Sequence, residues 1–450
     1  MIASLRVLLL LGIGSPALLL AVLGGASIVN RPLPERWIGR LTAGTMAVAA
    51  AALAAALAGH VVAGSGPVTL SYGAWSTSYE GGIRIEFLLD AMSLGFATLS
   101  AVIAGTVAAF SNRYLHREPG YNRYFVLLAM FVTGMLLVAL AGNVEVLFAG
   151  WELVGLSSAL LVGFFHDRPA PVSNALRVLA VYRISDAALL SAAVLLHYVA
   201  GSGSLSLLFG QTGAAAGLPG AGATTIAVLL VIAVAGKSAL LPFSGWLPRA
   251  MEGPTPSSAV YYGSLSIHAG CFLLLRAAPL LEQSPAARLL AGGIGLATAV
   301  FSTITARVQS DVKSSLAYAS LTQVGVIVLE IALGLYTIAF FHLAGHACFR
   351  LLQFLSAPNV LHDLHGLEAA IGGPASGSAS LTGLRVPSGV RRRVYLLALE
   401  RGFVDAILDR FVVEPFQGLA RYLSDVDRFL CDAVIGTMPG ARPKGEDDYE

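Results

Sequence analysis

Eleven apolar stretches, each long enough to cross a lipid bilayer, dominate this chain. Their approximate limits are 5–29, 38–63, 88–110, 122–141, 144–165, 173–199, 223–248, 256–278, 286–307, 312–333 and 336–355. A transmembrane helix needs about 20 apolar residues, and lipid tolerates only structures that satisfy their own backbone. Hydrophobic residues make up 56% of the chain and charged residues only 12%. The sequence therefore predicts an all-α polytopic membrane protein with the lipid bilayer as its main surroundings.

Basic residues in the loops predict how these helices are oriented. The loops after the first, third and fifth stretches carry Arg31, Arg36, Arg40, Arg113, Arg117, Arg123, Arg168 and Arg177. The loops after the second, fourth and sixth carry little positive charge beyond Arg84. Because positive loops stay in the cytoplasm, we expect the N-terminus outside and, after an odd number of helices, a cytoplasmic C-terminal tail. We expect the cell inner (cytoplasmic) membrane, with the first stretch a helix rather than a signal peptide.

The character of the sequence changes near its C-terminal end. Residues 367–394 are rich in Gly and Ser and are typical of a flexible linker. Residues 395–436 alternate apolar and charged side chains at helical spacing, with a break expected at Pro415. This pattern predicts an amphipathic region on the membrane surface or on a partner. Residues 437–450 are polar, and we expect them to be disordered.

Lys237 lies inside the apolar stretch 223–248, which carries no other charge before Pro242. An ammonium at membrane depth costs roughly 3 kcal/mol on insertion scales. Pro242 is expected to break the helix and to free backbone carbonyls that must face protein or water. A buried lysine beside a helix break indicates a protonation site on an ion path.

Two further stretches carry ionisable residues of both signs. Glu152 lies in the middle of the fifth stretch, and Arg183 and Asp186 lie in the sixth. Arg183 and Asp186 are three residues apart on a helix, so they share a face and can pair. Charges in such helices must find partners in the bundle interior or in a wet cavity. The Arg183–Asp186 pair can be part of a proton path or an inert structural pair.

The eleventh stretch carries a polar stripe of His342, His346 and Arg350, which are spaced at i, i+4 and i+8. Imidazoles can pass protons near neutral pH, but these histidines can also be ordinary helix-interface residues. As a metal site they are weak, because the zinc-protease glutamate and a third ligand are missing. The scattered cysteines form no C-x-x-C motif, and no dinucleotide, haem or flavin motif is present. We therefore expect no metal, no cofactor, no nucleic-acid partner and no redox or catalytic centre in this chain.

Several long motifs, in order along the chain, resemble those of antiporter-like membrane subunits. They are Phe87-Leu-Leu-Asp90-Ala-Met-Ser-Leu94, Gly150-Trp-Glu152-Leu-Val-Gly155, Tyr182-Arg-Ile-Ser-Asp186, Gly236-Lys-Ser-Ala-Leu-Leu-Pro-Phe-Ser-Gly-Trp246, Gln309-Ser-Asp-Val-Lys313, Phe341-His-Leu-Ala-Gly-His346-Ala-Cys-Phe-Arg350 and Phe403-Val-Asp-Ala-Ile-Leu-Asp409. The family includes the distal proton-pumping subunits of respiratory complex I, the large Mrp antiporter subunits and the Dab-type inorganic-carbon uptake subunits. The resemblance covers roughly residues 5–365 and 395–436.

The resemblance implies roles for particular residues. Glu152 and Lys237 would be the paired acid and base of one half-channel. Lys313 and the stripe from His342 to His346 would belong to the polar axis that leads to the next half-channel.

Two departures from the family pattern qualify these roles. Tyr262 stands where many members carry a relay histidine, and His268 could serve instead. Arg350 stands where lysine is common and, because arginine stays protonated, is assigned an electrostatic role.

The resemblance also implies a domain organisation with an incomplete second half. Residues 1–110 would form N-terminal helices, residues 111–280 one five-helix repeat broken at Pro242, and residues 281–366 a second repeat cut short after about three helices. The implied function is a proton- or cation-translocating membrane subunit of a complex I-like NADH:quinone oxidoreductase, assembled with other membrane subunits. The alternatives are the membrane subunit of a Dab-type inorganic-carbon complex with a cytoplasmic zinc-binding partner, and a non-conducting scaffold subunit.

Overall fold

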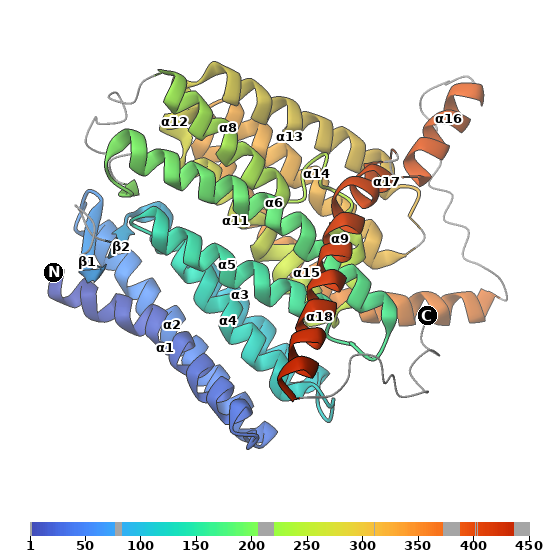
Figure 1. Cartoon of the computed structure of the whole chain (residues 1–450), viewed down its shortest axis with the longest axis horizontal. Helices are drawn as coiled ribbons and strands as arrows, with labels where there is room; N and C mark the ends of the chain where they lie inside the picture. Colours follow the sequence, from blue (N-terminus) through green and yellow to red (C-terminus); the bar gives the residue numbers. More distant parts are fainter. Residues whose placement is uncertain are drawn as a thin grey trace. The chain divides into compact units, whose positions relative to one another are not determined.

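The computed structural model describes residues 2–76, 83–205, 220–309, 311–371, 388–400, 402 and 404–435. Two units separate in it, Met1–Val404 and Asp405–Glu450. Within the described residues, 11 helical segments are long and apolar enough to cross a membrane. The predicted helical membrane protein with eleven spans is thereby confirmed (Figure 1).

The first two helices, α1 (Ile2–Ile28) and α2 (Glu35–Val62), pack against each other along their length (Figure 1). Helix α1 also packs on α4 (Tyr121–Leu140). Its outward side chains, such as Leu10 and Leu18, are apolar and exposed. A helix that is apolar on all sides suits a lipid environment.

A two-stranded antiparallel hairpin, β1 (Val68–Ser76) and β2 (Ile83–Leu89), interrupts the otherwise helical fold. The prediction of an all-α fold missed it, because the predicted third stretch begins at residue 88 and takes in only the last two residues of β2. That helix, α3 (Ala91–Tyr114), begins three residues later than expected, since Asp90 caps it. The Asp90 carboxylate accepts from the Ser93 amide at 2.7 Å, and the Asp90 amide donates to the Ser93 hydroxyl at 2.9 Å. This reciprocal capping box fixes the helix start.

Helices α4 and α5 (Val144–Val162) approach each other through a pair of glycines. A Cβ atom on Gly134 would lie 2.9 Å from the Gly150 carbonyl oxygen, and one on Gly150 would lie 2.7 Å from the Gly134 oxygen. Only glycine fits both sides of such a contact, as is common between membrane helices. Gly150 stands two residues before Glu152, so this contact sets the height of Glu152 against α4.

The broken helix follows α6 (Pro169–Ala200) in the bundle. Helix α8 (Gly220–Lys237) ends at Lys237 itself rather than at Pro242, which corrects the predicted position of the break. Ala239 then adopts a left-handed φ of 54°, and the Leu241–Pro242 peptide is cis. The Ser185 hydroxyl donates to the Ala233 carbonyl at 2.6 Å, and the Trp246 indole donates to the Gly236 carbonyl at 3.0 Å. The Trp246 bond satisfies a carbonyl that the early helix end leaves open, and the Ser185 bond joins α6 to α8.

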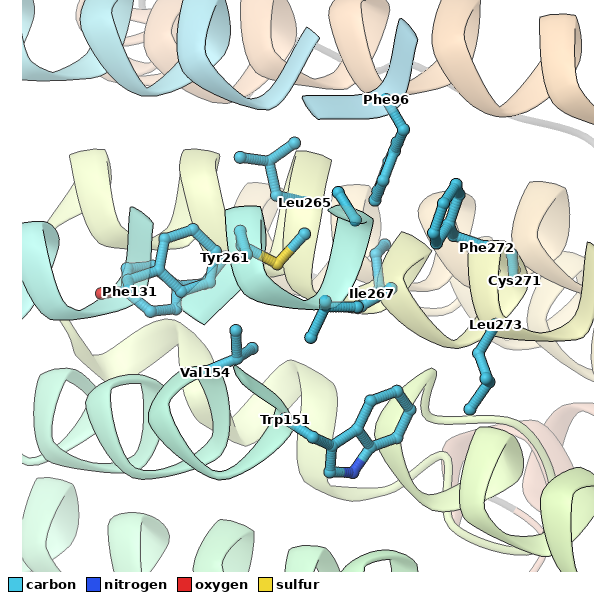
Figure 2. Close-up of a cluster of buried hydrophobic side chains, with 14 of the residues drawn as sticks. Phe96, Phe131, Trp151, Val154, Tyr261, Leu265, Ile267, Cys271, Phe272 and Leu273 are labelled. Atoms are coloured by element: carbon cyan, nitrogen blue, oxygen red, sulfur yellow. The ribbon is translucent and has the colours of Figure 1, made fainter. Parts of the chain in front are cut away.

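The next span is the most deeply buried one. After α9 (Trp246–Arg249) and η2 (Ala250–Glu252) it runs through α10 (Thr255–Ser257), the π-helix η3 (Ser258–Leu265) and α11 (Ser266–Arg276). Its whole 18-residue apolar window is buried. Helices α3, α4, α8, α14 and α15 all contact it. Figure 2 shows Tyr261, Ile267 and Phe272 of this span packing against Phe131, Trp151 and Phe96 of neighbouring helices. It forms the centre of the core.

Three more spans complete the larger unit, and the short α12 (Ala278–Gln283) precedes them. They are α13 (Pro285–Ala306), α14 (Val312–Ala332) and α15 (Tyr336–Ile371). The expected linker 367–394 is shorter than predicted at both ends, because α15 extends to Ile371 and α16 occupies Ser388–Leu399. Leu, Glu and Ala at the end of α15 are good helix formers, and so are Arg, Leu and Ala in α16. The remainder of that linker lies outside the described residues.

The smaller unit contains a strongly amphipathic helix. Short α17 (Val404–Leu408) and the π-helix η5 (Asp409–Val413) lead into α18 (Glu414–Ile435). Pro415 was predicted to break this helix, but the chain is helical on both sides of it, since the π-helix η5 runs directly into α18 at Glu414. Local π-helical turns of this kind can accommodate the missing N–H of a proline. Leu419, Tyr422 and Leu423 of α18 are exposed. The tail 437–450 lies outside the described residues.

Candidate functional site

Lys237 ends α8 inside the core and is completely buried. Its ammonium donates to the Trp151 carbonyl at 2.9 Å. The same nitrogen lies 4.5 Å from the centre of the Tyr182 ring and 5.0 Å from that of Trp151. Ring faces attract a cation most strongly where water is excluded. The charge of Lys237 is thus held by one carbonyl and two aromatic rings.

Gly155 makes room for this ammonium. A Cβ atom at Gly155 would lie 2.8 Å from the Lys237 nitrogen. A similar contact brings α8 against α6, since a Cβ at Gly236 would lie 2.8 Å from the Ser185 Cβ. The two glycines allow a long charged side chain to enter a closely packed helix contact.

Glu152, Arg183 and Asp186 form an ion-pair network on α5 and α6. Arg183 lies 2.8 Å from a Glu152 oxygen and 2.6 Å from an Asp186 oxygen. The exposed fraction falls inward, from 42% for the Arg183 side chain and 29% for Glu152 to 5% for Asp186. Together with Lys237 these three residues form what we name the lysine cluster. It leads from the side of the bundle to its core.

Glu152 and Lys237, the acid and base that the resemblance implies to be paired, are not in direct contact. Among the described residues no ion pair reaches Lys237, whereas Glu152 binds Arg183. The arginine fork can engage two carboxylates at once, and the Trp151 carbonyl takes the ammonium instead. The two groups therefore belong to one cluster but act on each other through space and through Arg183.

A second polar group, the histidine cluster, lies where α11, α14 and α15 meet. It consists of His268, Glu330, His342, His346 and Arg350. Nε2 of His268 lies 2.9 Å from Nδ1 of His346, and Arg350 donates from Nε to Nε2 of His346 at 3.0 Å. Arg350 also donates to the Ala319 carbonyl and the Gln353 side chain, at 2.8 and 2.6 Å. Nδ1 of His268 makes a short hydrogen bond with the Ser264 carbonyl.

His342 has separate partners one helical turn away. Its Nδ1 lies 3.0 and 3.1 Å from the two carboxylate oxygens of Glu330, and its Nε2 lies 3.1 Å from Oε1 of Gln323. The sequence analysis missed Glu330. The signal was available, because Glu330 is the only charge in the apolar run from Val324 to Leu335.

Tyr262 and Lys313, two other predicted pathway residues, lie outside both clusters. Tyr262 is buried and donates to the Ser158 carbonyl at 2.9 Å. Its ring packs on Trp246, which also packs on Tyr182, so an aromatic row leads toward Lys237. Lys313 is half-buried in the first turn of α14, and among the described residues no hydrogen bond or ion pair joins it to the histidines.

Asp90 and Arg276 form an ion pair that sequence reasoning did not single out. Arg276 ends α11, and its two terminal nitrogens lie 2.5 and 3.0 Å from the Asp90 carboxylate. Burial raises the pKa of Asp90, but the Arg276 charge and the hydrogen bonds from Arg276 and Ser93 outweigh it, so this pKa lies below its ordinary value. The pair ties the start of α3 to the end of the central span.

The chain is similar to proteins of known families. The profile described as "NADH:quinone oxidoreductase/Mrp antiporter, TM" matches residues 141–372. The profile "NADH-Ubiquinone oxidoreductase (complex I), chain 5 N-terminus" matches residues 75–125. All the quoted motifs except Phe403–Asp409 therefore fall inside matched segments.

Curated relatives of this chain come from the same family as these profiles. NADH-ubiquinone oxidoreductase chain 5 of Allomyces macrogynus is 34% identical over 306 residues, which cover 67% of this chain and 46% of the relative. NADH-quinone oxidoreductase subunit L of Rhodobacter capsulatus is 34% identical over 303 residues, which cover 65% of this chain and 42% of the relative. The chain thus spans about half the length of the curated relatives that it matches.

Solved structures share the fold. A chain of the Mrp complex from Dietzia sp. DQ12-45-1b superposes with a TM-score of 0.64 at 31% identity, over 75% of this chain and 37% of that chain. A chain of the membrane-bound sulfane sulfur reductase, an archaeal respiratory membrane complex, superposes with a TM-score of 0.68 at 19% identity, over 82% of this chain and 72% of that chain. At this identity the match shows a common fold alone. Because the first profile covers more than half of the chain, this multi-pass membrane protein belongs to the NADH:quinone oxidoreductase/Mrp antiporter family.

Proposed function

We propose that this chain moves protons across the membrane as a subunit of a complex I-like NADH:quinone oxidoreductase. The observation that carries the proposal is the lysine cluster, which leads from half-exposed Arg183 through Asp186 to a fully buried Lys237. A buried ionisable residue in a membrane helix marks an ion pathway more often than a packing role. The function is that of the assembled complex, in which this chain supplies part of the proton path.

The balance of charge in the lysine cluster suits a proton carrier. Two acids, Glu152 and Asp186, face two bases, Arg183 and Lys237. Arg183 cannot release its proton, so Lys237 is the base that can change charge. Its partners are a carbonyl and two rings rather than a carboxylate. A shift of Arg183 between its two carboxylates would change the field at Lys237 and favour release or capture of a proton.

We also propose which parts of this chain contact partner subunits and the membrane. Other membrane subunits would cover the half-exposed side of the lysine cluster and the apolar faces of α13 and α15, where Leu289 and Phe341 are exposed. The amphipathic α18 would rest on such a partner or on the membrane surface. We place the complex in the cell inner membrane, with the N-terminus outside. Lys313 would join the path at the end of α14.

Cation–proton antiport in an Mrp-type assembly is the second candidate. The 31% identity to a chain of the solved Mrp complex favours it. The lysine cluster would serve either function, because both need a buried group that binds and releases a proton. A Dab-type carbon-uptake complex and a non-conducting scaffold are outcomes that the experiment below separates.

The test is Lys237→Met in the assembled complex in its native membrane. We expect proton transport to fall at least about 100-fold, because removal of a positioned proton carrier has effects of this size. Thr225→Val, at an exposed position of the same helix, is the matched control and should transport normally. The amount of assembled complex is measured for both variants.

The driving reaction identifies the complex. Transport that starts on addition of NADH supports the redox assembly, transport driven by a sodium gradient supports antiport, and dependence on carbon dioxide supports the carbon-uptake system. Wild-type transport in Lys237→Met would sink the proposal and leave the scaffold role.

A further inference from the structure

His342 has partners that serve both of its charge states. The carboxylate of Glu330 accepts a hydrogen bond from Nδ1–H, at 3.0 and 3.1 Å. The Gln323 side chain, 3.1 Å from Nε2, offers an oxygen that accepts or, after rotation of its amide, a nitrogen that donates. Nε2 of His342 can therefore gain or lose a proton without losing its partner. Glu330 supplies a negative charge next to the protonated ring.

His346 and His268 have partners that serve only the neutral state. Arg350 can donate but never accept, so Nε2 of His346 must be an acceptor without a proton. A neutral His346 then carries its proton on Nδ1 and donates it to Nε2 of His268. His268 in turn donates from Nδ1 to the Ser264 carbonyl. Every hydrogen bond in this row is satisfied, and no lone pair is left for another proton.

We propose that Glu330 makes His342 the proton-loading residue of the second half of the bundle, and that Arg350 excludes His346 and His268 from this role. The inference rests on the proposed function, proton movement through this chain. It makes Glu330 part of the proton path, and it makes Arg350 the residue that keeps His346 and His268 neutral. On α15, His342 thus takes up a proton, whereas His346 stays neutral between Arg350 and His268.

The loading step is a simple proton transfer. Water or another acid gives a proton to the Nε2 lone pair of His342, which becomes an imidazolium beside the Glu330 carboxylate. Release breaks the same N–H bond and returns the proton to water, while Gln323 turns its amide to donate. The ionisable groups near His342 are Glu330 on α14, His346 on α15 and His268 on α11. Cys271 lies near Glu330, and Arg350 binds His346.

The experiment reads the charge of each histidine directly. The full chain, labelled with ¹⁵N-histidine and reconstituted in lipid, is followed by solid-state NMR between about pH 8 and pH 5, where histidine normally titrates. Subtraction of the His342→Gln and His346→Gln spectra assigns the two residues. We expect His342 to become cationic in this range and His346 to stay neutral. A cationic His346 with a neutral His342 would overturn the inference.

Two further variants test the partners. Glu330→Gln should lower the ratio of cationic to neutral His342 at a given pH by about tenfold or more, since an opposite charge at this distance is lost. Glu330→Asp should largely preserve this ratio, which guards against a mere folding defect. Arg350→Met should free Nε2 of His346 and let it become cationic. The matched control is Glu282→Gln, an exposed carboxylate that binds Tyr336 and should change neither histidine.

Transport in the assembled complex completes the test. Glu330→Gln should slow it about tenfold or more, as expected for a lost acid–base partner, and Glu282→Gln should not. Unchanged His342 charge and unchanged transport in Glu330→Gln would refute the inference even if Lys237→Met stops transport. The reverse pattern, the expected spectra with a transporting Lys237→Met complex, would refute the proposed function and leave the assignment of His342 standing.

Discussion

The lysine cluster and the histidine cluster bury charge in different ways. In the lysine cluster, Arg183 holds two carboxylates by ion pairs of 2.6 and 2.8 Å, and the buried ammonium of Lys237 rests on rings and a carbonyl. In the histidine cluster, Arg350 binds only neutral acceptors, and the single carboxylate, Glu330, serves His342. An arginine is central to both, but only the first is surrounded by opposite charge.

This difference indicates which contacts are sensitive to charge. Removal of an arginine from two carboxylates leaves two uncompensated charges, which a low-dielectric interior penalises strongly. Removal of an arginine from carbonyls and imidazoles leaves neutral groups, which lose only hydrogen bonds. The two arginines therefore make a matched pair for testing the roles of the clusters.

The largest effect is expected from Arg183→Met. It leaves Glu152 and Asp186 without their shared cation, and Lys237 is then drawn toward them and held in the charged form. We expect proton transport in the assembled complex to fall at least about 100-fold and the free energy of unfolding to drop by about 2–3 kcal/mol, less than for a fully buried pair. Proton flux and denaturation in lipid measure the two quantities.

Arg350→Met is the matched variant. Because its acceptors are neutral, we expect transport within about tenfold of wild type and a loss of about 1–2 kcal/mol in the free energy of unfolding. Equal losses of transport in the two variants would break the distinction between the clusters.

The coupling of Glu152 to its neighbours is the next effect in size. A double-mutant cycle on transport with Glu152→Gln and Arg183→Met should give a coupling energy of about 1–3 kcal/mol, since the two groups are in contact. The cycle of Glu152→Gln with Lys237→Met should give a smaller value, because the structure puts Arg183 rather than Lys237 on Glu152. A larger Glu152–Lys237 coupling would restore the direct pair expected from the resemblance.

The smallest effect on transport is expected from Asp90→Asn, outside both clusters. Transport should stay within about twofold of wild type, because Asp90 contacts neither cluster. Stability is a different matter, because the pKa of Asp90 is lowered in the fold. Its contribution to the free energy of unfolding is present above the ordinary aspartate pKa of about 3.9 and disappears as the pH falls through the lowered value.

Denaturation as a function of pH checks the contribution of Asp90 to the free energy of unfolding. Wild type should lose stability relative to Asp90→Asn only below about pH 4, and the difference should be constant from pH 6 to 8. A difference that grows between pH 6 and 8 would show that another group, and not Asp90, is responsible.

Apolar length was enough to predict the spans, and the position of Lys237 in an apolar stretch was enough to predict its burial. Eleven spans were predicted, and eleven are found in the described residues. The family predicted from the motifs is confirmed by the profile over residues 141–372. These features depend on composition over windows of about 20 residues, which lipid imposes without regard to tertiary contacts. The assigned pathway roles of Tyr262, Lys313 and the two clusters stay predictions.

Contacts between distant segments decided the rest. The hairpin of β1 and β2 depends on pairing across a turn, which the apolar pattern of a single segment does not reveal. At the end of α8, the open Gly236 carbonyl is satisfied by the Trp246 indole, which lies 10 residues later in the chain. Glu330 stood out as an isolated charge, but only the packing of α14 on α15 shows that it belongs to His342.

The sequence by itself determined that the chain crosses a membrane and that charged groups must meet inside it, because lipid leaves them no other choice. It did not determine which group meets which. Glu152 could reach Lys237 or Arg183, and only the tertiary structure shows that it binds Arg183, at 2.8 Å. Hydrogen-bond partners depend on distances of a few tenths of an ångström between helices, and those distances exist only in the tertiary structure.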